Sequence, residues 1–183
     1  GATRLGTGHI RHAGSGHTWL GFLSTPSKTA ENKLQQLLSI LQNSGLTSSI
    51  SDDIQAKLWA KLFVNVGING LTAIHNCSNG QLLDSSSVRN QLAKLVKEAE
   101  LVALAAKITI SEAPLQATLD VCKETADNIS SMLQDVRNKC PTEIGFINGR
   151  VSKIGRELNI PTPVNDELIA QVKKIENNYP EKR

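Results

Sequence analysis

The sequence predicts a mainly α-helical protein, and three observations support this fold class. Of its 183 residues 39% are hydrophobic but only 3% are aromatic, so the core must be built from Leu, Ile, Val and Ala. Strands are enriched in aromatic and β-branched residues, so this composition favours packed helices. From Ser27 onward the apolar residues recur with a period of about 3.6, as on one face of a helix. The length suits one domain with a sizeable core.

The first 24 residues differ from the rest of the chain. Glycines punctuate "GATRLGTGHIRHAGSGHTWLGFLS", and "AGSG" separates the short runs "HIRHA" and "HTWLGF". Such breaks between short runs predict a β-hairpin that turns at "AGSG". A lone hairpin is marginal in water, so we expect it to belong to a sheet whose other strands are absent from this chain.

Residues 25–183 are predicted to form one all-helical domain of about seven helices. The expected helices cover residues 27–45, 53 to the mid-70s, 85–107, 113–126, 129–139, 142–159 and 162–178. The first ends at Gly45, since glycine commonly terminates a helix. The last begins with Thr162 as N-cap and Pro163 in its first turn.

Charge, hydropathy and cysteine content exclude several classes of protein. The net charge is +3, and no basic stripe with interleaved aromatic residues indicates a nucleic-acid partner. No segment approaches about 18 consecutive apolar residues, and no signal-peptide pattern is present, so we expect neither a membrane span nor secretion. The three cysteines, Cys77, Cys122 and Cys140, show no C-x-x-C spacing. This usage favours a reducing, cytoplasmic setting.

No metal site and no phosphate-binding loop are predicted. Three of the four histidines lie in the expected hairpin, without the helical spacing of metal ligands. The stretch "GSGHTW" is not a G-x-G-x-x-G fingerprint, because Trp19 holds the position of the third glycine.

A narrow polar line interrupts the most apolar helix, "KLWAKLFVNVGINGLTAI". Lys61, Asn65 and Asn69 follow one another at steps of four and fall within an arc of roughly 80°. Amides in a dry pocket suit a polar ligand, and a lysine desolvated there gives up its proton more easily. The alternative is a solvent-facing stripe of an ordinary amphipathic helix. Spacing alone leaves both interpretations open.

A second polar cluster lies further along the chain. Asn128 and Ser131 are three residues apart and share a face if helical. Thr142 is a good N-cap, which would place Glu143 in the first helical turn, where the helix dipole favours its carboxylate. Asn79 precedes Gly80 and reads as a turn signal. Considered alone, Glu143 and Asn79 are explained by capping and turn formation.

Five stretches together resemble the ketopantoate reductase family (2-dehydropantoate 2-reductases), in that family's order and spacing. They are "KLWAKLFVNVGINGLTAI", "NCSNGQLL", "SSMLQDV", "PTEIGFING" and "IPTPVNDEL". The resemblance covers essentially the whole chain. It implies that residues 25–183 are the helical carboxy-terminal domain, of the type found in 6-phosphogluconate dehydrogenase. Residues 1–24 would then be the β-hairpin that closes an amino-terminal Rossmann domain.

The resemblance also implies an activity, the reduction of 2-dehydropantoate to pantoate by NADPH on the route to pantothenate and coenzyme A. Lys61 matches the general acid that protonates the ketone oxygen. The positions that match substrate-binding residues, or line the same pocket, are Asn65, Asn69, Asn79, Asn128 and Ser131. Glu143 matches a glutamate that contacts the cofactor, and Ala2 falls near a backbone position that touches the nicotinamide half.

Two departures from the family pattern matter. Gly145 stands where relatives often carry aspartate. The Rossmann domain, which would hold most of the NADPH site, is absent from this chain, so we expect the chain to require it and to be inactive alone.

Two alternatives remain. A related reductase could act on another 2-oxo acid. A non-catalytic helical module for dimerisation or partner binding would instead leave Lys61 exposed, with no pocket beside it. A homodimer fits either interpretation, since apolar helices such as "ELVALAAKI" can form an interface.

Overall fold

A computed structural model describes residues 2–12 and 14–179, and the mainly α-helical prediction is confirmed. The described residues form seven α-helices, one short 3-10 helix and four short strands. The chain divides into two compact units, Gly1–Lys57 (unit 1) and Leu58–Arg183 (unit 2). This division falls inside a helix, and the assignment of residues 1–24 to a nucleotide-binding domain stays a prediction.

Unit 1 contains a β-hairpin, but its turn is not where the sequence predicted it. Strands β1 (Ala2–Gly6) and β2 (His9–His12) pair antiparallel, with Gly6 opposite His9. The two-residue turn between them places Gly8 at a φ of +71°, a conformation that glycine adopts without strain. The prediction of a turn at "AGSG" is therefore wrong.

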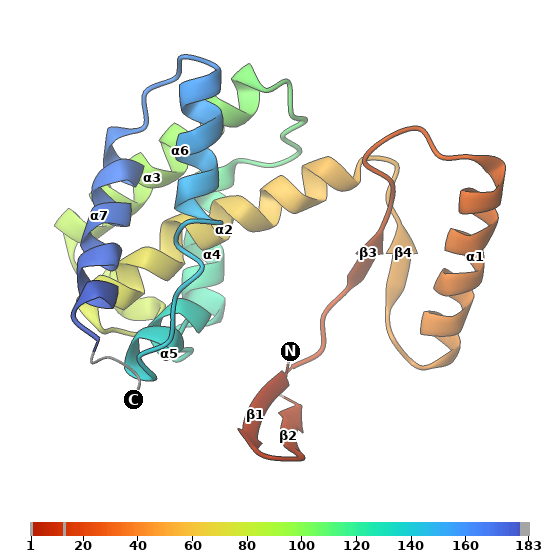
Figure 1. Ribbon diagram of the computed structural model, residues 1–183, viewed down its shortest axis with the longest axis horizontal. Coiled ribbons are helices and arrows are strands. Elements are labelled where there is room, and N and C mark those ends of the chain that lie inside the picture. Colours follow the sequence, from red (N-terminus) through yellow and green to blue (C-terminus); the bar gives the residue numbers. More distant parts are fainter. Residues whose placement is uncertain (1, 13, 180–183) are drawn as a thin grey trace. The chain divides into compact units, whose positions relative to one another are not determined.

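The second half of the glycine-rich stretch forms a strand with a distant partner. Strand β3 (Thr18–Leu20) pairs in parallel with β4 (Ser48–Ile50), and α1 (Lys28–Asn43) connects them (Figure 1). Parallel strands require a crossover of this kind. The Ser27 hydroxyl caps α1 by accepting a hydrogen bond from the Ala30 amide at 3.3 Å. This β3–α1–β4 arrangement is a βαβ unit, which no local signal in residues 1–24 indicates.

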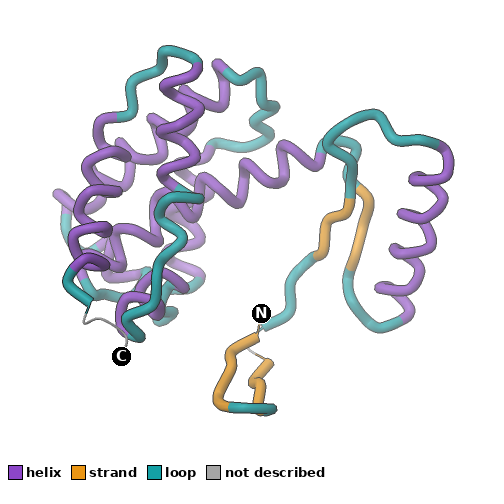
Figure 2. The backbone as a smooth tube through the Cα atoms, in the orientation of Figure 1, coloured by secondary structure: helices purple, strands orange, loops and turns teal. Residues whose placement is uncertain are grey.

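Unit 2 is a bundle of helices that begins with most of α2 (Ile54–His75), as Figures 1 and 2 show. The following elements are η1 (Gly80–Leu83), α3 (Ser86–Ala105), α4 (Pro114–Glu124), α5 (Ser131–Arg137), α6 (Asn148–Glu157) and α7 (Pro163–Asn177). Helices α3, α6 and α7 pack against one another, and α4 packs against α3. The core consists mainly of aliphatic side chains, among them the fully buried Leu71, Leu92 and Leu168.

Buried polar contacts fix the start of α7. Thr162 occupies the N-cap position as predicted, but its side chain makes no capping bond. The carboxylate of Glu98, on α3, instead accepts hydrogen bonds from the Val164 and Asn165 amides at 2.9 and 3.0 Å. The side-chain oxygen Oδ1 of Asn165 accepts a bond from the side-chain nitrogen Nδ2 of Asn148, which also donates to the Val66 carbonyl oxygen of α2. These contacts join α2, α3, α6 and α7.

Within residues 2–12 and 14–179, none of the helices is both long enough and apolar enough to cross a bilayer.

Candidate functional site

The polar line predicted on α2 becomes more buried along the helix. Lys61 is exposed, Asn65 is half-buried and Asn69 is only 7% exposed. Eight residues of helix separate Lys61 from Asn69, a rise of about 12 Å. The simple surface-stripe interpretation therefore fits Lys61 but not Asn69, whose amide must be accommodated inside the bundle.

Two hydroxyl groups connect α2 to α5 beside Asn69. Thr72 is fully buried, and its Oγ1 lies 2.9 Å from the Asn69 carbonyl oxygen and 2.6 Å from Oγ of Ser130. Ser130 is the N-cap of α5 and accepts a bond from the Leu133 amide at 3.1 Å. Ser131 is the first residue of that helix and is exposed. The structure thus brings the predicted positions 69 and 131 into one region.

Asn79 and Asn128 also meet, through their backbones. The Asn79 amide donates to the Asn128 carbonyl oxygen at 3.0 Å, and Gly80 bonds the Ala126 carbonyl in the same way. A Cβ at Gly80 would lie 2.7 Å from that of Ala126, so this approach requires glycine. Asn128 lies in the loop before α5, so the shared helical face expected for residues 128 and 131 is wrong. Two hydrogen-bonded contacts, one beside Asn69 and Ser131 and one between Asn79 and Asn128, are nevertheless joined by the short segment 128–131.

The Asn79 side chain has one satisfied and one unsatisfied end. Its Nδ2 donates to Thr125 Oγ1 at 2.8 Å, and that hydroxyl donates to the Val121 carbonyl at 2.6 Å. Its Oδ1 is buried and accepts no hydrogen bond from the part of the chain that the structure describes. A buried acceptor without a donor costs about 1–3 kcal/mol, so it needs a structural or functional reason.

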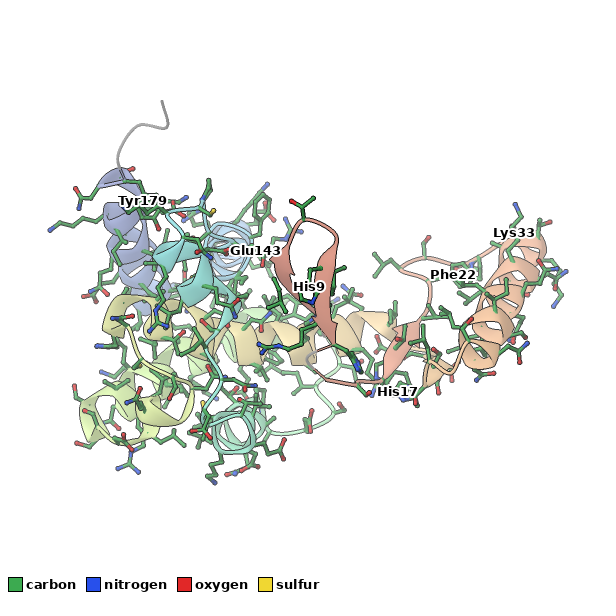
Figure 3. All side chains as sticks on the ribbon, turned by 90° about the horizontal axis from the view of Figure 1, so that it is seen from below. His9, His17, Phe22, Lys33, Glu143 and Tyr179 are labelled. Carbon is green, nitrogen blue, oxygen red and sulfur yellow. The ribbon has the colours of Figure 1, made fainter. Side chains whose placement is uncertain are left out.

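Glu143 is not in the first turn of a helix, which corrects the sequence prediction. It lies in a separate turn that precedes α6, between α5 and α6 in Figure 3, and it is exposed. The backbone leaves the helical conformation at Ile147, with a ψ of −89°, and this separates the turn from α6. Before the turn, Glu176 Oε1, on α7, accepts bonds from both the backbone amide and the hydroxyl of Thr142, each at 2.6 Å. This carboxylate holds the residue before Glu143, and the helix starts only at Asn148.

The charges around this turn act on one another. Burial raises the pKa of Asp135, on α5, and the Glu143 carboxylate raises it further. Burial opposes ionisation of Glu176, but hydrogen bonds from Lys173 and Thr142 outweigh it and lower the pKa. Burial and then the Glu176 charge raise the pKa of Tyr179, which lies just beyond α7 (Figure 3). Glu143 therefore lies close enough to α5 to raise the pKa of Asp135.

Sequence reasoning did not identify Ser130, Thr125 or Glu176 as contributors to this region. The preference for serine at an N-cap could have singled out Ser130. No local signal marks Glu176, because its partner Thr142 is 34 residues away.

Other features lie apart from these residues. Ala2 is exposed at the start of β1, in unit 1. A cavity of about 680 Å³ in unit 1 is lined by residues from the segment before α1, from α1, and from the end of β4 to the start of α2. None of the predicted site residues lines it. Phe22, labelled in Figure 3, and Leu34 and Ile50 are among its apolar lining residues. No group of three or more His, Cys, Asp or Glu residues is placed to hold a metal ion in residues 2–12 and 14–179.

Comparisons with known proteins point to one family. Residues 53–176 match the model of the family described as "Ketopantoate reductase PanE/ApbA C terminal". A 2-dehydropantoate 2-reductase of Vibrio cholerae serotype O1 is 34% identical over 180 residues, which is 98% of this chain and 59% of the relative. The chain thus spans about three fifths of that relative's length.

Solved structures have the same fold. A PanE/ApbA family ketopantoate reductase from Ralstonia eutropha JMP134 superposes with a TM-score of 0.87 at 29% identity, over 97% of this chain and 57% of that one. D-mandelate dehydrogenase, solved with NADH and anilino(oxo)acetate, gives a TM-score of 0.84 at 29% identity, over 97% of this chain and 58% of that one.

Proposed function

The chain belongs to the ketopantoate reductase C-terminal family, and from this premise we propose that it forms the substrate-binding and proton-donating part of an NADPH-dependent 2-dehydropantoate 2-reductase. The observation that carries the proposal is a pair of hydrogen-bonded contacts. Thr72 and Ser130 join α2, which carries Asn69, to the residue before Ser131, and the Asn79 backbone bonds that of Asn128. These residues come from α2, the start of η1, the loop before α5 and α5 itself.

The reaction needs a hydride on the ketone carbon and a proton on the ketone oxygen. NADPH supplies the hydride when bound. In our proposal Lys61 donates the proton to the oxygen as the C=O bond becomes C–O–H, and the lysine is left neutral. Its exposure leaves the ammonium group open to a substrate. A positioned general acid typically contributes about 10² to 10⁴ in rate.

Binding of the 2-oxo acid requires donors for its carboxylate. The Ser131 hydroxyl and the side-chain amide nitrogens of Asn65 and Asn69 are neutral donors. They can bind and orient the substrate carboxylate by hydrogen bonds, and the positive charge of Lys61 then remains available to the ketone oxygen. We propose that these residues, with Asn79 and Asn128, hold the substrate so that the carbonyl carbon faces the hydride. A single cation then polarises the carbonyl without a metal.

The cofactor side of the proposal concerns two residues that are far apart in the sequence. Glu143, on its separate exposed turn, and the backbone of Ala2 are proposed cofactor contacts. The β3–α1–β4 unit is of the kind from which nucleotide-binding sheets are built, which supports an origin of unit 1 in a Rossmann domain. We propose that the remaining part of such a domain holds most of the NADPH site, and that the enzyme works in the cytoplasm as a homodimer.

A second candidate function is reduction of a different 2-oxo acid. The fold neighbour D-mandelate dehydrogenase was solved with anilino(oxo)acetate, so this architecture accepts a 2-oxo acid other than 2-dehydropantoate. The exposed Lys61 also agrees with a non-catalytic module, and catalysis separates that alternative from both reductases.

The test measures NADPH oxidation by the full-length protein that carries this chain, with 2-dehydropantoate and a panel of other 2-oxo acids. We expect turnover with 2-dehydropantoate, lowered about 10² to 10⁴-fold by Lys61→Ala. Lys94→Ala, which removes another exposed lysine from α3, is the matched control and should retain full activity.

Each other result changes one part of the proposal. Near-normal turnover of Lys61→Ala would show that another group is the acid. Turnover only with a different 2-oxo acid would change the proposed substrate but leave the proposed mechanism intact. No turnover with any 2-oxo acid would favour the binding module.

A further inference from the structure

The buried hydroxyl pair between α2 and α5 has a defined direction of hydrogen bonding. Thr72 Oγ1 lies 3.0 Å from the Ile68 carbonyl oxygen and 2.9 Å from that of Asn69. Carbonyl oxygens only accept, so the single Thr72 proton must point towards them. The contact of 2.6 Å between the two hydroxyl oxygens must then use the proton of Ser130. Ser130 therefore donates to Thr72.

This direction accounts for every role of the two hydroxyls. Ser130 Oγ accepts from the Leu133 amide at 3.1 Å and donates to Thr72. Thr72 accepts from Ser130 and donates to the backbone of its own helix. Thr72 is 0% exposed and Ser130 is 7% exposed, so both are shielded within the bundle. The protons of both hydroxyls are used inside the protein, and neither is free to bind a substrate.

The pair connects two residues of the proposed substrate site. On one side the chain of hydrogen bonds ends at the carbonyl of Asn69 itself. On the other side it ends at the N-cap of α5, one residue before Ser131. We propose that Thr72 and Ser130 are positioning residues that set the separation between Asn69 and Ser131, and so determine how tightly the 2-oxo acid is held. This inference rests on the proposed function.

The principal test is Thr72→Val in the full-length protein. Valine keeps the shape of threonine but removes the hydroxyl, which leaves the Ser130 proton without its acceptor. We expect KM for 2-dehydropantoate to rise about tenfold or more, while kcat falls less and the dissociation constant of NADPH stays unchanged. Thr72→Ser restores the hydroxyl and should bring KM back towards the wild-type value.

Thr118→Val is the matched control. Thr118 is also fully buried and helical, and its hydroxyl bonds the Pro114 carbonyl four residues earlier at 2.8 Å, within its own helix α4. If burial of a hydroxyl were the whole reason for the effect, Thr118→Val would raise KM as much as Thr72→Val does. Equal rises in KM would overturn the proposal, and so would failure of Thr72→Ser to restore KM.

A second measurement does not depend on catalysis. Because the Leu133 amide donates to Ser130 Oγ, its hydrogen exchange reports on the anchored start of α5. We expect Thr72→Val to accelerate exchange at Leu133, with no change at Ala30, whose amide donates to the cap of α1. Unchanged exchange at Leu133 would overturn the link between the helices. If the wild-type protein reduces no 2-oxo acid, the proposed function is wrong. Hydrogen exchange at the Leu133 amide would still show whether the Thr72–Ser130 contact anchors α5 to α2.

Should Thr72→Val not fold, Ser130→Ala breaks the same contact from the α5 side. It should raise KM for the 2-oxo acid selectively, as Thr72→Val does. A loss of NADPH binding of equal size would contradict a role confined to the substrate.

Discussion

Helices α1 and α2 follow one another in the chain and both carry regularly spaced apolar residues, yet they are buried very differently. Ten residues of α2 are buried, among them Leu71 at 0% exposure, whereas α1 has no buried residue and leaves Leu37 43% exposed. An apolar face predicts that a helix forms, but it does not say how much of that face finds a partner. The stabilising burial of this chain is concentrated in unit 2.

The largest effect should come from shortening a leucine in each helix. Leu71→Ala is expected to lower the free energy of unfolding by about 2–5 kcal/mol, because it leaves a cavity in a packed core. Leu37→Ala removes the same atoms from a solvent-exposed side chain, and should change the free energy of unfolding by no more than about 0.5 kcal/mol. Urea unfolding of the two variants measures the difference. Equal losses would mean that the face of α1 is buried in solution.

A smaller effect on stability is expected from neutralising a glutamate, and its size should depend on what the carboxylate binds. Glu98→Gln places an NH₂ group near three donors at the start of α7 and should cost about 1–3 kcal/mol. Glu31→Gln, in α1, removes only a surface pair with Lys28 at 3.0 Å and should cost no more than about 0.5 kcal/mol. Denaturant midpoints of both variants make the comparison. A mild Glu98→Gln would indicate that α7 starts without this cap.

The third prediction concerns acid stability. The pKa of Glu176 is lowered in the folded state from 4.5, so its contribution is present above that value. It is lost as the pH falls through the lowered folded pKa. Glu176→Gln should therefore destabilise most near neutral pH, with a difference from wild type that shrinks as the pH falls below the ordinary value of 4.5. Unfolding free energies between about pH 3 and 7 test this, and a difference that stays constant with pH would contradict it.

A modest effect is expected from loss of the cap at the start of α1. Ser27→Ala removes an exposed cap and should cost about 0.5–1 kcal/mol, seen as faster hydrogen exchange at Ala30. A loss of more than about 2 kcal/mol would show that unit 1 depends on this cap far more than its exposure suggests.

The sequence was informative wherever structure depends on neighbouring residues. The apolar period located the helices, and the glycine after α1 marked its end correctly, since Gly45 has a φ of +79°. The spacing of Asn65 and Asn69 placed them along one side of α2. These features depend on residues within one or two helical turns of each other.

The errors arose where distant segments meet. Strand β3 was assigned to a local hairpin because its parallel partner β4 comes only after a whole helix. The start of α6 was placed too early, because the non-helical backbone at Ile147 has no signal in the neighbouring sequence, and the Glu176 carboxylate that binds Thr142 lies 34 residues away. In the same way, the contact between Thr72 and Ser130 joins residues 58 positions apart, and neither residue type predicts the other.

The cap that Glu98 provides for α7 also has a consequence for how the protein is made. Glu98 precedes its backbone partner Val164 by 66 residues, so on the ribosome it is synthesised seconds before the amides that it will bind. Until those amides arrive, the growing chain lacks the donors that the half-buried Glu98 carboxylate binds in the folded protein. Helix α7 therefore completes unit 2, and a nascent chain that stalls before residue 163 should be a substrate for chaperones rather than a smaller stable domain.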